Sequence, residues 1–213
     1  MDGILGAAAF RLAAAAVLSY LLGCFNGAVI ISKYILRDDV RTHGSGNAGL
    51  TNFYRTFGGP LTLAVILCDV LKAVAAVLLS VGLLGTPFGW ETLSKYWGGL
   101  FCLLGHMYPC MFQFKGGKGI LSGGAIVLMI DWRIALVAWA GFLVLAVLTR
   151  YVSLGSVWAG ASFPVTTWFL YHDWVLLLLG IAMGGLTVWK HRGNIHRLLT
   201  GTESKFSFHH KKE

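Results

Sequence analysis

The fold of this chain is decided by residues 57–84, which read FGGPLTLAVILCDVLKAVAAVLLSVGLL. The only charged side chains in this stretch are Asp69 and Lys72. A membrane-spanning helix needs about 20 consecutive apolar residues, and this stretch is longer. Asp69 and Lys72 are neighbours on one helix face, where pairing lowers the cost of placing both charges in lipid. The stretch therefore predicts a transmembrane helix with an internal ion pair, whose role is equally open between structure and function.

The composition extends this interpretation to the whole chain. Of the 213 residues, 56% are hydrophobic and 12% are charged, and the mean hydropathy is +0.71. Soluble domains average roughly 45–50% apolar and about 25% charged residues. Because a soluble domain of this size cannot hide so much apolar surface, the composition predicts that lipid surrounds the protein.

Six further apolar runs are separated by short polar or turn-forming segments. They cover residues 4–36, 96–114, 120–130, 134–148, 152–170 and 174–189. Backbone groups in lipid must be hydrogen-bonded internally, so each run is expected to be helical. The sequence thus predicts an all-α polytopic transmembrane bundle of about seven spans, forming a single membrane-integral domain over residues 1–213. The first run exceeds one span, so a kink is expected near Asn26, and five spans plus re-entrant segments are an open alternative.

The basic residues set the expected orientation. The net charge is +8, and Lys and Arg concentrate in alternate loops and after the last run. Because cytoplasmic loops carry the excess of Lys and Arg, the N-terminus is expected outside and the C-terminus in the cytoplasm. Basic residues at the ends of apolar runs favour anionic lipid and phosphorylated substrates as partners, and no nucleic acid is expected.

The cysteines do not form a recognisable site. None of the four shows CxxC spacing, and each lies in or beside an apolar run: Cys24, Cys68, Cys102 and Cys110. This pattern predicts reduced, structural thiols rather than a metal or redox centre.

The first long polar stretch, residues 42–55, reads THGSGNAGLTNFYR. Glycines let the backbone approach a ligand and point amide N–H groups at it, and Arg55 offers a planar fork that suits phosphate oxygens. Residues 51–55 are expected to open the second long helix, whose dipole also favours an anion. The alternative is a flexible loop with an interfacial arginine. The candidate phosphate-binding residues are Gly44, Ser45, Gly46, Asn47, Thr51, Asn52 and Arg55.

The second stretch, residues 105–119, reads GHMYPCMFQFKGGKG. Two lysines flank two glycines and a helix is expected to begin just afterwards, which is a phosphate-binding arrangement of amides, helix N-terminus and cations. The spacing is not that of a Walker A loop. The alternative is a pair of lysines that snorkel to the membrane boundary. The candidates are Lys115, Gly116, Gly117, Lys118 and Gly119, and His106 either supports them or only bridges helices.

The third stretch, residues 189–203, reads WKHRGNIHRLLTGTE. On a helix, His191, Asn194 and Arg197 share one broad face. The alternative is a basic amphipathic segment on anionic lipid. Glu203 is expected to be a helix-end charge partner or a lock on one of the cations. Residues 209–212 are expected to form a solvated tail.

Ser156 closes the segment YVSLGS at residues 151–156, which is expected to begin the sixth helix on the cytoplasmic side. The hydroxyls of this segment either join a site there or cap the helix.

Together these segments resemble the bacterial membrane-integral acyl-phosphate:glycerol-3-phosphate acyltransferase family, PlsY. The matching stretches, in order and spacing across nearly the whole chain, are GSGNAGLTNFYR at 44–55, GHMYPCMFQFKGGKG at 105–119 and HRGNIHRLLTGTE at 191–203, with lesser matches DVLK at 69–72 and YVSLGS at 151–156. The resemblance implies a seven-helix protein of the bacterial cell membrane whose site opens to the cytoplasm. It also implies acyl transfer from acyl phosphate to the sn-1 hydroxyl of glycerol 3-phosphate, giving lysophosphatidic acid for phospholipid synthesis.

The resemblance also implies roles for residues. The candidate catalytic residues are Ser45, Lys118, His191 and Asn194, which bind substrate phosphate together with the residues of the first two stretches and Ser156; His106, Arg197 and Glu203 would support them. The expected partners are acyl phosphate, glycerol 3-phosphate, membrane lipid and, functionally, an acyl-phosphate-forming enzyme. No cofactor and no metal is expected. Residues 23–27 and 120–124 and Gly155 depart from the usual family pattern, which puts acyl-chain preference or kinetics in question.

The expected mechanism depends on positioning. Cationic groups neutralise the two phosphates and orient the hydroxyl toward the acyl carbonyl, where proximity can supply roughly 7–11 kcal/mol. The proton acceptor is either His191 or the acyl phosphate itself, with the latter slightly favoured. An acyl-CoA-dependent enzyme would need an HxxxxD motif, which the sequence lacks. An organophosphate transporter is the alternative from another class, and it would place cations at the bilayer midplane, often with inverted repeats.

Overall fold

The computed structural model of the chain describes residues 2–206, and the tail expected at 209–212 lies outside them. Every regular element within the described residues is a helix, so the all-α prediction is confirmed. The chain forms two compact units, one up to Ile130 and the other from Asp131 onward.

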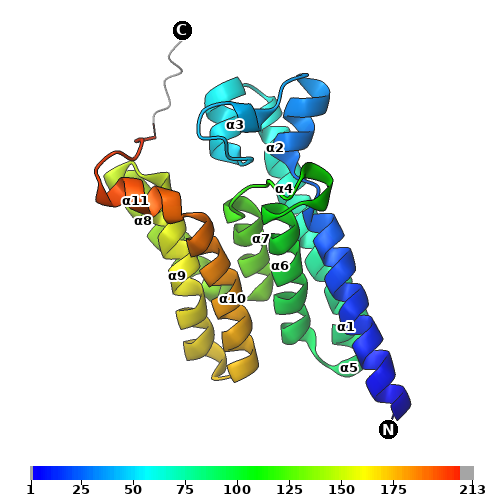
Figure 1. Cartoon of the computed structure of the whole chain (residues 1–213). Coiled ribbons are helices and arrows are strands. Elements are labelled where there is room, and N and C mark those ends of the chain that lie inside the picture. The colour runs from blue at the N-terminus through cyan, green and yellow to red at the C-terminus, as the bar shows by residue number, and fades with distance from the viewer. Residues whose placement is uncertain (1, 207–213) are drawn as a thin grey trace. The chain divides into compact units, whose positions relative to one another are not determined.

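The first unit is built around three long helices: α1 (Asp2–Gly23), α4 (Leu61–Ser80) and α6 (Glu91–Met107) pack on one another, and α7 (Ile120–Ile130) packs on α4 and α6 (Figure 1). Small residues allow these close approaches. A Cβ atom at Gly98 of α6 would lie 2.9 Å from the carbonyl oxygen of Ala76 on α4. The shorter elements of this unit are α2 (Gly27–Ile30), η1 (Ile31–Ile35), η2 (Val40–Thr42), α3 (Leu50–Phe57), η3 (Val81–Gly85), α5 (Thr86–Phe88) and η4 (Cys110–Phe112).

Asn26 marks the break that was expected in the first apolar run. Helix α1 ends at Gly23 and α2 begins at Gly27. The Asn26 side chain accepts a hydrogen bond from the backbone N–H of Val29 at 3.0 Å and so caps α2. The expected kink is confirmed as a short interruption of the helix.

The expectation that residues 51–55 open the second long helix is wrong. They belong to the separate helix α3, which ends at Phe57, and α4 begins only at Leu61. Gly58 and Gly59 have φ angles of 57° and 67°, a left-handed conformation that favours glycine. This pair of residues therefore ends α3 and turns the chain before Pro60.

The second unit consists of α8 (Trp132–Thr149), α9 (Val152–Tyr171), α10 (Trp174–Lys190) and the short helix α11 (Arg192–Leu199). Helix α9 packs on both α8 and α10, as Figure 1 shows for this unit. The polar breaks predicted near residues 131, 150 and 172 all coincide with helix ends. Asp131 and Asp173 cap α8 and α10, because their carboxylates accept backbone N–H groups of the first turn.

Among the described residues, three helical segments are long and apolar enough to cross a membrane: Leu5–Gly23, Leu61–Phe88 and Trp132–Thr149. Helices α10 and α11 pass the same test only as a pair, and they are bent by 56° at the junction. The helix Ile120–Ile130 is apolar but shorter. The expected number of about seven spans and the orientation of the termini therefore stay predictions.

Candidate functional site

The first two polar stretches share one small apolar core within the first unit. Val29, Val40, Ala48 and Phe53 pack with Phe112, which comes from the second stretch, and each of these side chains is buried. Since one core lies beneath both stretches, the two loops are held in a fixed relation to each other.

Asn52 organises the first loop from inside. Its side-chain amide donates to the carbonyl oxygens of Val40 and His43 at 2.9 and 3.1 Å, and its carbonyl oxygen accepts the backbone N–H of Ser45 at 3.0 Å. The residue is 3% exposed, so the side chain is committed to the loop. Asn52 thereby sets the backbone that presents Ser45.

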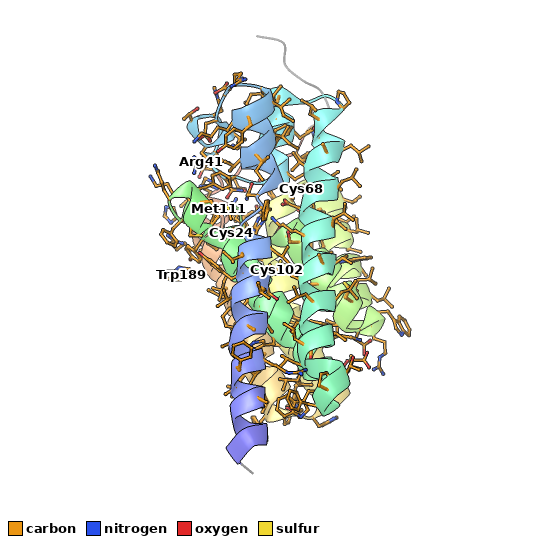
Figure 2. The ribbon with its side chains drawn as sticks, turned by 90° about the vertical axis from the view of Figure 1, so that its right-hand side faces the viewer. Cys24, Arg41, Cys68, Cys102, Met111 and Trp189 are labelled. Carbon is orange, nitrogen blue, oxygen red and sulfur yellow. The ribbon has the colours of Figure 1, made fainter. Side chains whose placement is uncertain are left out.

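Asn26 and Arg41 tie this loop to its surroundings, and neither was a site candidate from the sequence. The Asn26 amide donates to the carbonyl oxygen of Ala48 at 3.0 Å. Arg41, labelled in Figure 2, donates to the carbonyl oxygen of Phe112 at 2.9 Å and pairs with Asp39 at 2.7 Å. The hydrogen bonds from Arg41 hold the pKa of the Asp39 carboxyl below its usual value. Arg41 therefore stays paired while it joins the two loops.

The glycine pair of the second loop packs against α6. The backbone N–H groups of Gly116 and Gly117 donate to the carbonyl oxygens of Met107 and His106 at 3.3 and 3.2 Å. The prediction that these two amides point at a ligand is therefore wrong, because they satisfy the C-terminal carbonyls of α6. The glycines are needed for close packing: a Cβ atom at Gly117 would lie 2.7 Å from the Ala48 carbonyl oxygen and would overlap the His106 ring nitrogen.

Polar and cationic groups of the two loops face outward. Ser45, Arg55 and Lys115 are exposed, Lys118 is half-buried, and Gly44, Gly46 and Gly119 have positive φ angles. Helix α7 begins at Ile120, directly after the second loop, as expected. Asn47 and Thr51 are half-buried beside the same loop. The first unit thus carries the cations of two separate motifs on two loops that share one apolar core.

A buried charge cluster lies beneath the second loop. Lys72 Nζ lies 2.6 Å from Asp69 Oδ1 and 2.8 Å from His106 Nδ1, and the side chains of all three residues are at most 4% exposed. The predicted pair of Asp69 and Lys72 is confirmed. His106 bridges α4 and α6, as one of its two interpretations required.

The third motif is organised by Glu203 within the second unit. The Glu203 carboxylate accepts hydrogen bonds from Ser153, Asn194 and Arg197, each at 2.7 Å. Burial acts to raise the pKa of Glu203, but these hydrogen bonds outweigh it and hold the pKa below its usual value. The expectation that Glu203 locks one of the cations is confirmed for Arg197.

His191 and Ser156 are both buried in the second unit. His191 Nδ1 lies 2.8 Å from the carbonyl oxygen of Thr187, so Nδ1 carries a proton and donates it. Ser156 donates to the carbonyl oxygen of Val152 at 2.9 Å, and Ser153 binds Glu203. Neither serine caps α9, so that interpretation of their hydroxyls is wrong. Within residues 2–206, no group of three or more His, Cys, Asp or Glu side chains is arranged to hold a metal ion.

The fold and these loops define an integral membrane protein with cationic motifs at its helix ends. A family model described as glycerol-3-phosphate acyltransferase matches residues 13–201. A glycerol-3-phosphate acyltransferase of Thermoanaerobacter pseudethanolicus is 37% identical over 190 residues, covering 89% of this chain and 93% of the relative. One of Fusobacterium nucleatum is 36% identical over 192 residues, covering 90% and 96%. The chain belongs to this family of membrane acyltransferases.

Solved structures support the same assignment. The crystal structure of PlsY, an integral membrane glycerol 3-phosphate acyltransferase, in its glycerol 3-phosphate form matches with a TM-score of 0.82 and 34% identity, covering 92% of this chain and 96% of that one. The lysophosphatidic acid form of PlsY matches with a TM-score of 0.79. The likeness spans both compact units of the chain.

Proposed function

We propose that this chain transfers an acyl group from acyl phosphate to the sn-1 hydroxyl of glycerol 3-phosphate, giving lysophosphatidic acid and inorganic phosphate. The observation that carries the proposal is that two loops built on one apolar core carry the exposed residues Ser45, Arg55 and Lys115 and the half-buried Lys118, in a chain of the glycerol-3-phosphate acyltransferase family. Both proposed substrates carry phosphate, and the solved PlsY structures are of glycerol 3-phosphate and lysophosphatidic acid forms.

The first unit supplies the main phosphate-binding cations in this proposal. Arg55 offers a bidentate fork and Lys118 a point charge, two complementary ways to hold phosphate oxygens. Ser45 adds a hydroxyl from a backbone that Asn52 fixes. Gly116 and Gly117 contribute by close packing, because their amides bond α6.

The second unit supplies His191 and Asn194, and the two units together form one acyltransferase domain over residues 1–213. Glu203 orients Asn194 and binds Arg197, which supports their expected place around the substrates. Ser156, in the same unit, is buried and donates a hydrogen bond to the carbonyl oxygen of Val152, one helical turn earlier. We propose that these groups, like the cationic residues of the first unit, bind the phosphorylated substrates.

The reaction balances without a cofactor. The sn-1 hydroxyl oxygen attacks the acyl carbon, and the bond between that carbon and the phosphate oxygen breaks. Phosphate departs with the electron pair and accepts the hydroxyl proton, directly or through His191. Cations that hold the phosphate before reaction stabilise the charge it carries as it leaves.

A substitution of His191 tests which group accepts the hydroxyl proton. His191 Nδ1–H donates a hydrogen bond to the Thr187 carbonyl oxygen, so Nε2 is the ring nitrogen that can accept a proton. Once protonated, Nε2 can donate a hydrogen bond to phosphate. We favour the acyl phosphate as acceptor. A His191→Gln variant that keeps turnover would exclude His191 as the base, whereas complete loss would contradict the substrate-assisted route if phosphate binding is unchanged.

The chain is proposed to lie in a bacterial cell membrane with about seven spans, formed by α1, α4, α6, α7, α8, α9 and α10, and with its site toward the cytoplasm. Lipid and an enzyme that forms acyl phosphate are the expected partners. Membrane-impermeant maleimide distinguishes the two faces, because Cys110 is exposed in the second loop. Labelling of Cys110 in intact cells, rather than only in inverted vesicles, would contradict this orientation.

The reaction is tested with purified protein, glycerol 3-phosphate and three acyl donors in parallel: acyl phosphate, acyl-CoA and acyl carrier protein. Lysophosphatidic acid is expected only from acyl phosphate. Arg55→Ala and Lys118→Ala are each expected to lower kcat/KM by at least 100-fold, and Lys95→Ala of α6, a half-buried lysine paired with Glu91, serves as the control. A strict requirement for acyl-CoA would refute the donor, and full activity in both variants would refute the site.

A further inference from the structure

The buried cluster of Asp69, Lys72 and His106 has a defined hydrogen-bond order. Lys72 Nζ lies 2.6 Å from Asp69 Oδ1, 2.8 Å from His106 Nδ1 and 2.8 Å from the carbonyl oxygen of Phe25. An ammonium group has three N–H donors and no acceptor, so all three donors are used and Nδ1 must accept. The network therefore assigns His106 as the neutral tautomer with its proton on Nε2.

That protonated nitrogen faces the second loop. A Cβ atom built on Gly117 would overlap His106 Nε2, which places the ring against the Gly117 backbone. The main chain of His106 also accepts the Gly117 N–H at 3.2 Å. Both the side chain and the backbone of one residue thus contact the middle of the 115–119 loop, between the two lysines.

Asp69 also connects the cluster to two neighbouring elements, α2 and α7. Asp69 Oδ1 accepts the backbone N–H of Gly27 at 3.3 Å, and the Asp69 carbonyl oxygen accepts the Ser122 hydroxyl at 3.0 Å. These contacts reach the break after α1 and the first turn of α7. Charged groups in a membrane protein are costly and are usually retained where they serve a site.

We propose that Asp69, Lys72 and His106 act together as positioning residues that hold the 115–119 loop in the geometry in which its lysines bind substrate phosphate. Asp69 fixes Lys72, Lys72 fixes the tautomer and orientation of His106, and His106 fixes Gly117. None of the three needs to touch a substrate. Misplacement of a binding group by about 1 Å can cost 100-fold in rate, so the effect on turnover is expected to exceed the effect on folding.

Two substitutions of His106 separate these roles. In His106→Asn, the amide oxygen occupies the level of Nδ1 and still accepts from Lys72, but nothing reaches Gly117. In His106→Gln, the longer side chain restores a polar group at the level of Nε2. Ser80→Ala is the matched control: it removes a buried 2.7 Å hydrogen bond between the same helices, about 12 Å along α4 from Lys72.

The test uses the full chain in lipid vesicles and measures three quantities: thermal stability, kcat/KM, and the rate of trypsin cleavage after Lys115 and Lys118, assigned by mass spectrometry. His106→Asn is expected to be cleaved several-fold faster at these lysines and to lose at least 10-fold in kcat/KM, with a Tm no lower than that of Ser80→Ala. His106→Gln is expected to recover part of both losses.

The kinetic readout rests on the proposed function, whereas the cleavage readout does not. Absence of any turnover in the wild-type protein would refute the proposed function and leave the cleavage comparison to decide the positioning role. Wild-type cleavage and turnover in folded His106→Asn would overturn the inference. The inference would also be overturned if the changes in kcat/KM and in cleavage rate in His106→Asn were no larger than those of Ser80→Ala at the same loss of Tm.

Discussion

At the scale of single residues, Gly117 is the point where both loops of the first unit meet. A Cβ atom at this position would overlap the His106 ring nitrogen and would lie 2.7 Å from the Ala48 carbonyl oxygen. We expect Gly117→Ala to lower kcat/KM by at least 10-fold and to destabilise the fold by about 1–3 kcal/mol, the usual cost of overpacking. Activity and thermal unfolding measure the two effects.

Gly123→Ala is the control for this substitution. Gly123 lies in α7 just after the same loop, and its Cβ atom would meet only Leu103 Cδ2 at 3.7 Å, an ordinary contact. Alanine favours a helix over glycine by about 1 kcal/mol, so this variant is expected to be neutral or more stable. Equal kinetics for the two alanine variants would show that close packing at Gly117 has no role in catalysis.

At the scale of elements, Glu203 follows α11 in the chain and connects this segment to α9 through a hydrogen bond from Ser153. Its side chain is 6% exposed, and its carboxylate accepts hydrogen bonds from Ser153 of α9 and Arg197 of α11. Since hydrogen bonds to a charged group contribute about 1.5–3 kcal/mol, we expect Glu203→Gln to lower Tm by several degrees near neutral pH. The loss of Asn194 orientation is expected to lower kcat/KM as well.

The pH dependence of this fastening follows from the lowered pKa of Glu203. A carboxyl with a lowered pKa in the folded state contributes stability above its unfolded pKa, about 4.3, and loses it as pH falls through the folded value. The difference in Tm between wild type and Glu203→Gln should therefore shrink below about pH 4.3. Glu91→Gln is the control, because the Glu91 side chain is 67% exposed and its pair with Lys95 contributes little. A Tm difference that stays constant down to pH 3 would contradict the role of the Glu203 charge.

The elements also show what the sequence alone could establish. Apolar runs located some helices closely: the run at 120–130 is α7, and the run at 174–189 is α10 with one more residue. The run at 96–114 was less accurate, because α6 begins already at Glu91 and ends at Met107. Hydropathy does not reveal tertiary hydrogen bonds. The bond from Asn26 to Ala48 spans 22 positions and the bond from Arg41 to Phe112 spans 71, so neither leaves a local pattern. The inward direction of the Gly116 and Gly117 amides likewise depends on the carbonyl groups at the end of α6.

At the scale of the whole molecule, the proposed site draws on two units that are each compact by themselves. Arg55 and Lys118 belong to the first unit, and His191 and Asn194 belong to the second. If all four groups hold the same substrates, ligand binding stabilises the chain only when both sets are intact. Stabilisation by the ligand then depends on both sets of residues, and this dependence is a coupling that thermal unfolding can measure.

Thermal unfolding with and without glycerol 3-phosphate tests this coupling. A ligand at 100 times its Kd stabilises the folded state by about 2.7 kcal/mol, which raises Tm by several degrees. We expect this rise in the wild-type protein, its loss in both Arg55→Ala and Asn194→Ala, and its retention in Arg133→Ala, whose exposed side chain is paired with Asp131 at 2.7 Å. A full rise in Asn194→Ala would contradict the proposed role of Asn194 in binding glycerol 3-phosphate. Loss of the rise in both variants, with the basal Tm unchanged, would support the proposed roles of Arg55 and Asn194 in binding glycerol 3-phosphate, because each substitution would then remove binding without unfolding the chain.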